Sequence, residues 1–155
     1  MHESFLRYAE SLHPSFERLT TMVGVTIPTL PKDAPSQAIY LFSESDRHLY
    51  VGRTKNLKQR LRQHSIPGSQ QNQAVFAFRL AREATGRMIA AYTIQGSRTA
   101  MTADEEFATA FTEAKRRVRA MQVRYVEETD PLRQALLEIY ASIVLQTPYN
   151  DFHTH

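Results

Sequence analysis

Cysteine is absent from this chain of 155 residues. Without cysteine the protein forms no disulfide, no thiolate zinc site and no cysteine nucleophile, so its stability must come from packing. Long apolar runs are missing too, because no stretch approaches the roughly 18 residues that cross a bilayer. The first 20 residues carry charges where a signal peptide needs an unbroken apolar segment. We therefore expect a cytoplasmic protein that has no membrane partner.

Acidic residues are missing from a long internal segment, since none lies between Asp46 and Glu83. The segment holds eight bases, namely Arg47, Arg53, Lys55, Lys58, Arg60, Arg62, Arg79 and Arg82. The rest of the chain has 11 bases against 16 acids, and 15 of the 19 bases overall are arginine, which suits bidentate contact with phosphate. This asymmetry is typical of a polyanion-binding surface, although a solvated helix face gives the same pattern.

Composition and length predict one compact domain over 1–155, because 42% apolar and 23% charged residues are ordinary for a globular protein. Apolar residues at helical spacings predict a helix over about 1–22, and Pro28, Pro31 and Pro35 then indicate an extended strap up to residue 36. Residues 67–120 are expected to form a mostly helical insertion.

The remaining elements follow from periodicity and from capping residues. Short apolar runs predict a β-hairpin of strands 38–42 and 48–52, and a third strand over 121–126. A helix is expected from the N-cap Asn56 to Pro67-Gly68, another over 103–120 with a capping box at 102–105, and a third from Asp130-Pro131 to Leu145. Residues 73–83 fit either a helix or a strand, and 88–94 fit a strand or an irregular apolar segment. The expected class is α/β (α+β): a small three-stranded, mainly antiparallel sheet flanked by helices.

Two tripeptides, Ala38-Ile39-Tyr40 and Tyr50-Val51-Gly52, stand ten residues apart in the predicted hairpin. Together with the arginine and histidine of the next helix, Arg60 and His64, and with the late pair Glu138 and Asn150, they resemble the motifs of GIY-YIG nucleases. The resemblance is strongest over 37–66 and 132–152. Ala38 stands where that family usually has its first glycine, a change that removes no reactive group.

The resemblance implies a metal-dependent endonuclease with Tyr40 as general base and Tyr50 beside it positioning the water. Phosphodiester hydrolysis also needs charge neutralisation on the phosphoryl oxygens and help for the leaving oxygen. Arg60 and His64 are four residues apart and share a helix face, so both can point at one phosphate. We expect Arg60 to stabilise the transition state, and Glu138 to hold one Mg²⁺ (or Mn²⁺) together with the substrate phosphate. Further bases expected to contact the nucleic acid are Arg53, Lys55, Lys58 and Arg62.

Several alternatives stay open at this point. Glu138 lies off the widest apolar arc of its helix and could be merely solvated, while Glu127 or Glu128 could compete for the metal. Asn150 could position a water, support the metal site or cap the turn after Pro148, and His64 could simply close its helix. DNA is the expected substrate, with RNA not excluded. The competing functions are a catalytically inactive nucleic-acid-binding module and a partner-docking protein on the same scaffold.

Overall fold

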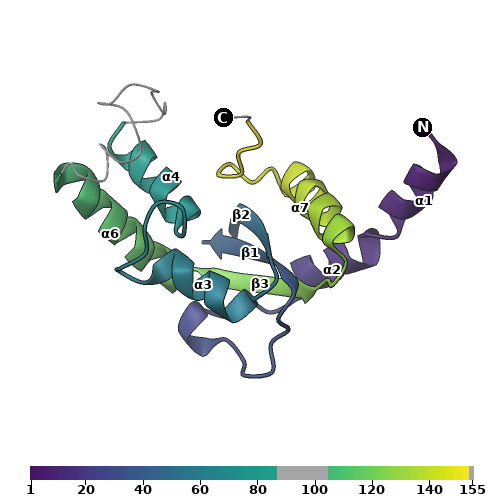
Figure 1. Cartoon of the computed structure of the whole chain (residues 1–155), viewed down its shortest axis with the longest axis horizontal. Coiled ribbons are helices and arrows are strands. Elements are labelled where there is room, and N and C mark those ends of the chain that lie inside the picture. The colour runs from purple at the N-terminus through teal and green to yellow at the C-terminus, as the bar shows by residue number, and fades with distance from the viewer. Residues whose placement is uncertain (87–104, 154–155) are drawn as a thin grey trace. The chain divides into compact units, whose positions relative to one another are not determined.

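The computed structural model describes residues 1–86 and 105–153 (Figure 1). Contacts divide the chain into two compact units. The sheet unit comprises Met1–Lys58 and Met121–His155, and the helical unit comprises Gln59–Ala120. The predicted apolar segment 88–94 and most of the predicted capping box at 102–105 lie outside the described residues.

The sheet unit is built on three strands, β1 (Ala38–Glu44), β2 (Arg47–Thr54) and β3 (Gln122–Glu127). Their order is β2-β1-β3, and β1 pairs antiparallel with both neighbours. The predicted three-stranded antiparallel sheet is therefore confirmed. Both hairpin strands are longer than predicted, because the turn between them consists only of Ser45 and Asp46. Both turn residues have positive φ (50° and 61°). That conformation matches the right-handed twist of the flanking strands.

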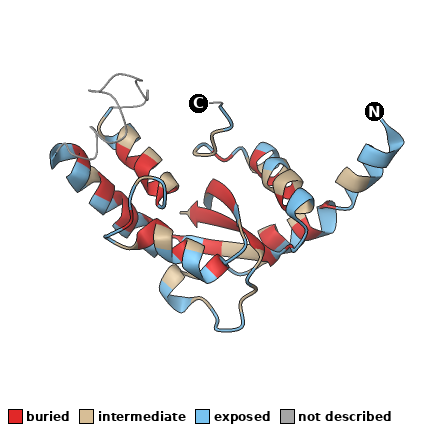
Figure 2. Ribbon diagram, viewed as in Figure 1, coloured by how far each residue is buried: buried red, intermediate tan, exposed pale blue. Residues whose placement is uncertain are grey.

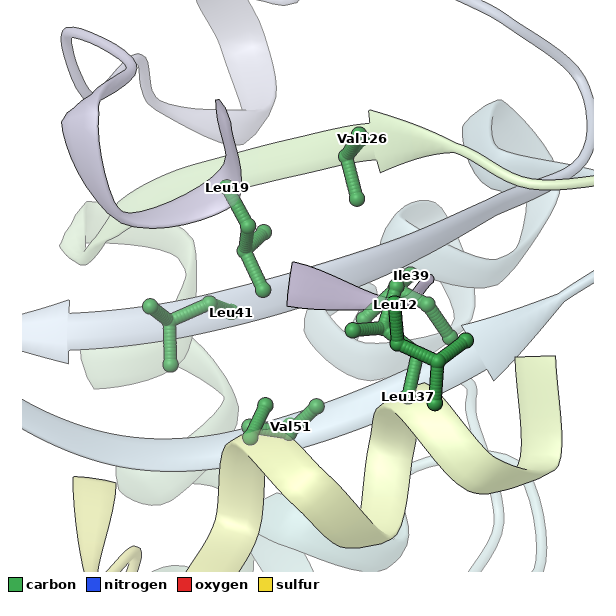
Figure 3. Packing of buried hydrophobic residues seen from close by; sticks show 8 residues of the cluster. Leu12, Leu19, Ile39, Leu41, Val51, Val126 and Leu137 are labelled. Atoms are coloured by element: carbon green, nitrogen blue, oxygen red, sulfur yellow. The ribbon is translucent and has the colours of Figure 1, made fainter. Parts of the chain in front are cut away.

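Alternation along the strands gives the sheet two different faces. Ile39, Leu41 and Val51 point to one face, where they form a core cluster with buried residues of the helical segments that cover it (Figure 3). Those segments are α2 (His13–Thr21) and α7 (Pro131–Leu145). The buried aromatic residues of β1 and β2 alternate with this set and thus belong to the opposite face.

Helix α7 begins where the sequence predicts. Asp130 is its N-cap, and its side chain accepts hydrogen bonds from the backbone N–H groups of Leu132 and Arg133, both at 2.9 Å. Pro131 follows in the first turn, where its missing N–H costs nothing and its fixed φ suits a helix.

The N-terminal segment differs from the prediction of one helix over 1–22. It forms two helices, α1 (Glu3–Glu10) and α2, with a break at Ser11 and Leu12. Pro14 explains the break, because a proline inside a continuous helix removes a hydrogen bond and clashes with the preceding turn. In the first turn of α2 it is tolerated. Residues 1–22 thus bend at the proline, and α1 buries none of its side chains (Figure 2).

Both outer strands of the sheet have part of their free edge covered. The strap after α2 contains the short helix η1 (Ile27–Thr29), and just before it Val25 exchanges two backbone hydrogen bonds with Val123 of β3. At the other edge, the N–H of Tyr149 in the C-terminal tail donates to the carbonyl of Leu49 in β2. Covered edges have fewer unpaired backbone groups to offer to other chains.

The helical unit contains most of α3 (Leu57–Ser65), together with α4 (Val75–Ala84) and α6 (Glu105–Ala120). Residues 73–83, which fitted either helix or strand, are thus largely helical. Helices α4 and α6 pack through aromatic rings, with Phe78 and Phe107 edge-to-face at 5.2 Å between centroids. No helix among the described residues is long and apolar enough to cross a membrane.

Replacing Leu137 tests the core on the α7 side of the sheet. Leu137 is fully buried in the cluster of Figure 3, so Leu137→Ala should lower the free energy of unfolding by roughly 2–5 kcal/mol. The matched control is Leu132→Ala, on the same helix but 59% exposed, which should change it by less than about 0.5 kcal/mol. Urea denaturation measures both, and equal losses would contradict the described packing.

Candidate active site

Tyr40 and Gly52 face each other across β1 and β2, and the glycine makes room for the tyrosine. A Cβ added at Gly52 would overlap with Cζ and Oη of Tyr40. The phenol therefore lies directly against the backbone of the edge strand β2. The second tripeptide thus supplies the space that the tyrosine of the first one occupies.

Tyr50 lies on the same face as Tyr40, with 6.4 Å between the ring centroids. Phe42 lies opposite Tyr50 in the β1–β2 pairing and packs edge-to-face against Tyr40, with 5.8 Å between the ring centroids. All three rings are buried, and Tyr40 is only 1% exposed. The structure therefore brings the two predicted tyrosines together, in an aromatic layer that restricts how either ring can move.

Arg53 follows Gly52 in β2 and forms an ion pair with Glu138 of α7, with 2.9 Å between Nε and Oε2. The Glu138 side chain is 18% exposed, whereas that of Arg53 is 48% exposed. Burial raises the pKa of Glu138, and the charge and hydrogen bond of Arg53 act in the opposite direction. Glu138 is thus a half-buried, paired carboxylate, which argues against the alternative of a merely solvated side chain.

Gln134 anchors α7 one turn before Glu138. Its amide nitrogen donates to the carbonyl oxygens of Thr54 at 3.1 Å and Glu128 at 2.7 Å, where β2 and β3 end. Residues four apart share a helix face, so this attachment also fixes where Glu138 points. A polar residue on the buried side of α7 was the sequence signal for this contact, which the sequence analysis missed.

Asn150 is bound to the backbone of β2. Its amide oxygen accepts from the N–H of Val51 at 2.9 Å, and its amide nitrogen donates to the Val51 carbonyl at 2.8 Å. The Thr147 hydroxyl donates to the same amide oxygen at 2.7 Å. Asn150 thereby clamps the C-terminal tail to the edge strand beside Gly52.

The other two carboxylates that could compete for a metal ion are Glu128 and Glu127. Glu128 is largely buried and pairs with Arg133, with 3.0 Å between Nε and Oε2. Glu127 ends β3 and is exposed. The described residues contain no group of three or more His, Asp or Glu side chains that could hold a metal ion. Among the described residues, fewer than three such side chains would therefore hold a metal, which suits Mg²⁺ because that ion keeps several waters and also binds phosphate.

Arg60 and His64 belong to the helical unit. The Arg60 guanidinium donates to the Gln73 carbonyl at 2.9 Å. His64 is fully buried, and its pKa is held well below the ordinary value, mainly by desolvation and also by the charge of Arg60. A neutral, buried imidazole cannot interact with a helix dipole as a cation. Its burial favours a role in packing over contact with a phosphate.

The remaining predicted phosphate contacts are exposed. Lys55 and Lys58 lie in the sheet unit, around the start of α3, and Arg62 lies farther along that helix, in the helical unit. Within the sheet unit, Tyr40 lies against Gly52 on one face of β2, and the next residue, Arg53, pairs with Glu138 on the other face, which α7 covers. The sequence analysis predicted neither the contact of Gly52 with Tyr40 nor the ion pair of Arg53 with Glu138, because neither contact is local in sequence.

Comparison with known proteins identifies a family for the chain. The sequence model of the GIY-YIG catalytic domain matches residues 36–141, more than half of the chain. Tyr40, Tyr50, Arg60, His64 and Glu138 lie inside the matched range, whereas the clamp by Asn150 lies beyond it. No curated protein and no solved structure matches the chain.

Gly52→Ala tests the contact between Gly52 and Tyr40. The new methyl group overlaps with the phenol, so we expect a loss of about 1–3 kcal/mol in the free energy of unfolding. Combining it with Tyr40→Leu should give a smaller loss than the sum of the two single changes, as expected for residues in contact. Gly68→Ala is the control, because a Cβ there meets nothing within 4 Å. Additive losses in denaturation experiments would show that the two residues do not touch.

Proposed function

We propose, since the chain belongs to the GIY-YIG family of nucleases, that it is a Mg²⁺-dependent endonuclease that hydrolyses phosphodiester bonds in DNA. The observation that carries this proposal is the set formed in the sheet unit, where the hydroxyl of Tyr40 lies against Gly52, and Arg53, the next residue, pairs with Glu138. The phenol thus meets this edge strand on one face of the sheet, and the guanidinium and the carboxylate meet it on the face that α7 covers. These groups suit proton transfer, phosphate binding and cation binding, respectively.

Glu138 is the residue that would hold the metal ion. Its oxygens are hard ligands, and its cationic partner Arg53 is half exposed and can turn to a phosphate when a cation binds. When bound there, Mg²⁺ supplies positive charge that polarises a phosphoryl oxygen. Gln134 keeps the carboxylate in place, because it ties α7 to the ends of two strands.

Tyr40 acts in this proposal as the general base that accepts a proton from the attacking water. The glycine opposite it leaves no side chain between the phenol and the backbone of the edge strand. Tyr50 supports the water position from the same face, and Asn150 holds the edge strand in register by clamping Val51. Asn150 is thus a positioning residue.

The positive charge that binds the substrate phosphates comes from the segment between Asp46 and Glu83, which holds no acidic residue. Arg60 stabilises the charge of the transition state, and the exposed Lys55, Lys58 and Arg62 contact the phosphates of the backbone. His64 supports α3 as a buried neutral side chain.

A plasmid cleavage assay tests the proposed activity. Purified protein with Mg²⁺ should nick supercoiled DNA, whereas Tyr40→Phe and Glu138→Gln should each lower the rate by about 100-fold or more. The matched controls are Tyr125→Phe, which changes the tyrosine paired with Tyr40 on β3, and Glu113→Gln, on the exposed side of α6. Both should retain cleavage close to that of the unaltered protein. Binding of DNA without cleavage by any of these proteins would indicate an inactive binding module instead.

The pH dependence of cleavage tests the ion pair. Burial raises the pKa of Glu138 and Arg53 lowers it, so Arg53→Ala leaves burial unopposed and raises this pKa further. Glu138 then binds a proton at higher pH, and the acid limb of the rate–pH profile should move to higher pH. Arg53→Lys should move it less, and Lys55→Ala, which removes a nearby exposed base, should leave its position unchanged. An acid limb that stays in place in Arg53→Ala would contradict the pairing.

A further inference from the structure

The helical unit contains a groove of about 510 Å³ between the loop that follows α3 and one side of α6. Its lining comes from Ser69, Gln70 and Gln71 in the loop and from Phe111, Thr112 and Lys115 in α6. The volume lies within the roughly 300–1,000 Å³ range of sites for small organic ligands. None of these residues takes part in the proposed cleavage chemistry.

Lys115 gives the groove a wall in which the ammonium group is already bonded within the protein. The side chain is buried, and Nζ donates hydrogen bonds to the carbonyl oxygens of Pro67 and Ser69. The same ammonium lies 4.0 Å from the centroid of the Phe111 ring. Its donors are thus directed to the protein, so the groove is not built to attract a phosphate through this lysine. A neutral ligand fits it better.

Ser69 provides a polar group that is ready for a ligand. Ser69 is one of the residues that line the groove, and its buried Oγ has no hydrogen-bond partner among the described residues. A buried hydroxyl without a partner costs free energy, which a ligand with donors and acceptors would recover. The amides of Gln70 and Gln71 and the hydroxyl of Thr112 add groups that can pair with the edge of a nucleobase.

The charge of the unit indicates that such a base is part of a nucleic acid. Residues 59–120 contain 10 bases and 5 acids, whereas the rest of the chain has 9 bases and 11 acids. Arg116 and Arg119 are exposed on α6, the helix that forms one side of the groove. Binding of single-stranded nucleic acid combines basic side chains that follow the backbone with sites that receive individual bases.

We propose that this groove takes up an unpaired nucleobase, so that the protein selects nucleic acid with single-stranded or extrahelical nucleotides. The proposal rests on the nuclease function above and adds a substrate class to it. An unpaired base costs least to place in such a site, because no base pair has to be broken.

Binding measurements with Glu138→Gln protein separate this proposal from the cleavage chemistry. The probes are two DNA duplexes of the same sequence, one fully paired and one with a single extrahelical 2-aminopurine. Fluorescence anisotropy should show about tenfold tighter binding of the second duplex, and the 2-aminopurine emission should change on binding. Free adenosine monophosphate is the competitor that tests for a mononucleotide site, and it should not displace the duplex.

Variants of the groove provide the decisive comparison. Ser69→Ala removes a hydroxyl that has no partner, so thermal stability should not fall, whereas the preference for the extrahelical base should decrease by about fivefold. Thr112→Phe should block the groove, and Thr109→Phe is its matched control. Both threonines are exposed on α6 and bond to the carbonyl four residues earlier, but Thr109 does not line the groove.

The outcomes distinguish the two proposals. Tighter binding of the extrahelical duplex that is lost in Ser69→Ala and Thr112→Phe, but kept in Thr109→Phe, supports the groove as a base site. Equal binding of both duplexes overturns the base site and leaves the nuclease proposal standing. Displacement by adenosine monophosphate overturns it in favour of a free-nucleotide site. Absence of any binding to DNA overturns both proposals.

Discussion

The register between β1 and β2 is the constraint on which the site depends. Pairing Tyr40 with Gly52 places the phenol on the one residue of the edge strand that has room for it. A shift of one residue would turn every side chain of a strand to the other face of the sheet. It would bring Tyr40 into the core beside α7 and move Ile39 and Leu41 to the face where the aromatic residues now lie. The same register that buries the core therefore also presents the tyrosine.

Helix α7 links the core to the candidate site. Leu137 packs into the cluster shown in Figure 3, and its neighbour Glu138 emerges beside Arg53. Gln134 and the N-cap Asp130 fix where the helix starts and how it lies on the strand ends. Burial beneath the helix raises the pKa of Glu138, and the charge and hydrogen bond of Arg53 on the adjacent strand lower it. The core and the site thus share one helix.

The helical unit contributes a different property, the concentration of positive charge. The sheet unit carries slightly more acids than bases, whereas residues 59–120 carry twice as many bases as acids. Lys115 departs from this pattern, because its ammonium ties the loop after α3 to α6 from inside. The loop it holds forms one wall of the groove that we assign to an unpaired base. Structural and binding roles are therefore divided among the basic residues of one unit.

The sequence determined whatever depends on short spacing. Alternating apolar residues specified the three strands, Asp130-Pro131 marked the start of α7, and the two tripeptides indicated the family. Pro14 is also a local signal, and it divides the predicted N-terminal helix in two.

Only the tertiary structure decided which distant groups meet. The pairing of Arg53 with Glu138 and the clamp of Asn150 on Val51 join residues separated by most of the chain. Spacing along a sequence carries no information on such contacts, because they depend on how helices and tails pack onto the sheet. The burial that makes His64 neutral also follows from packing, and the same residue in an exposed helix would titrate normally.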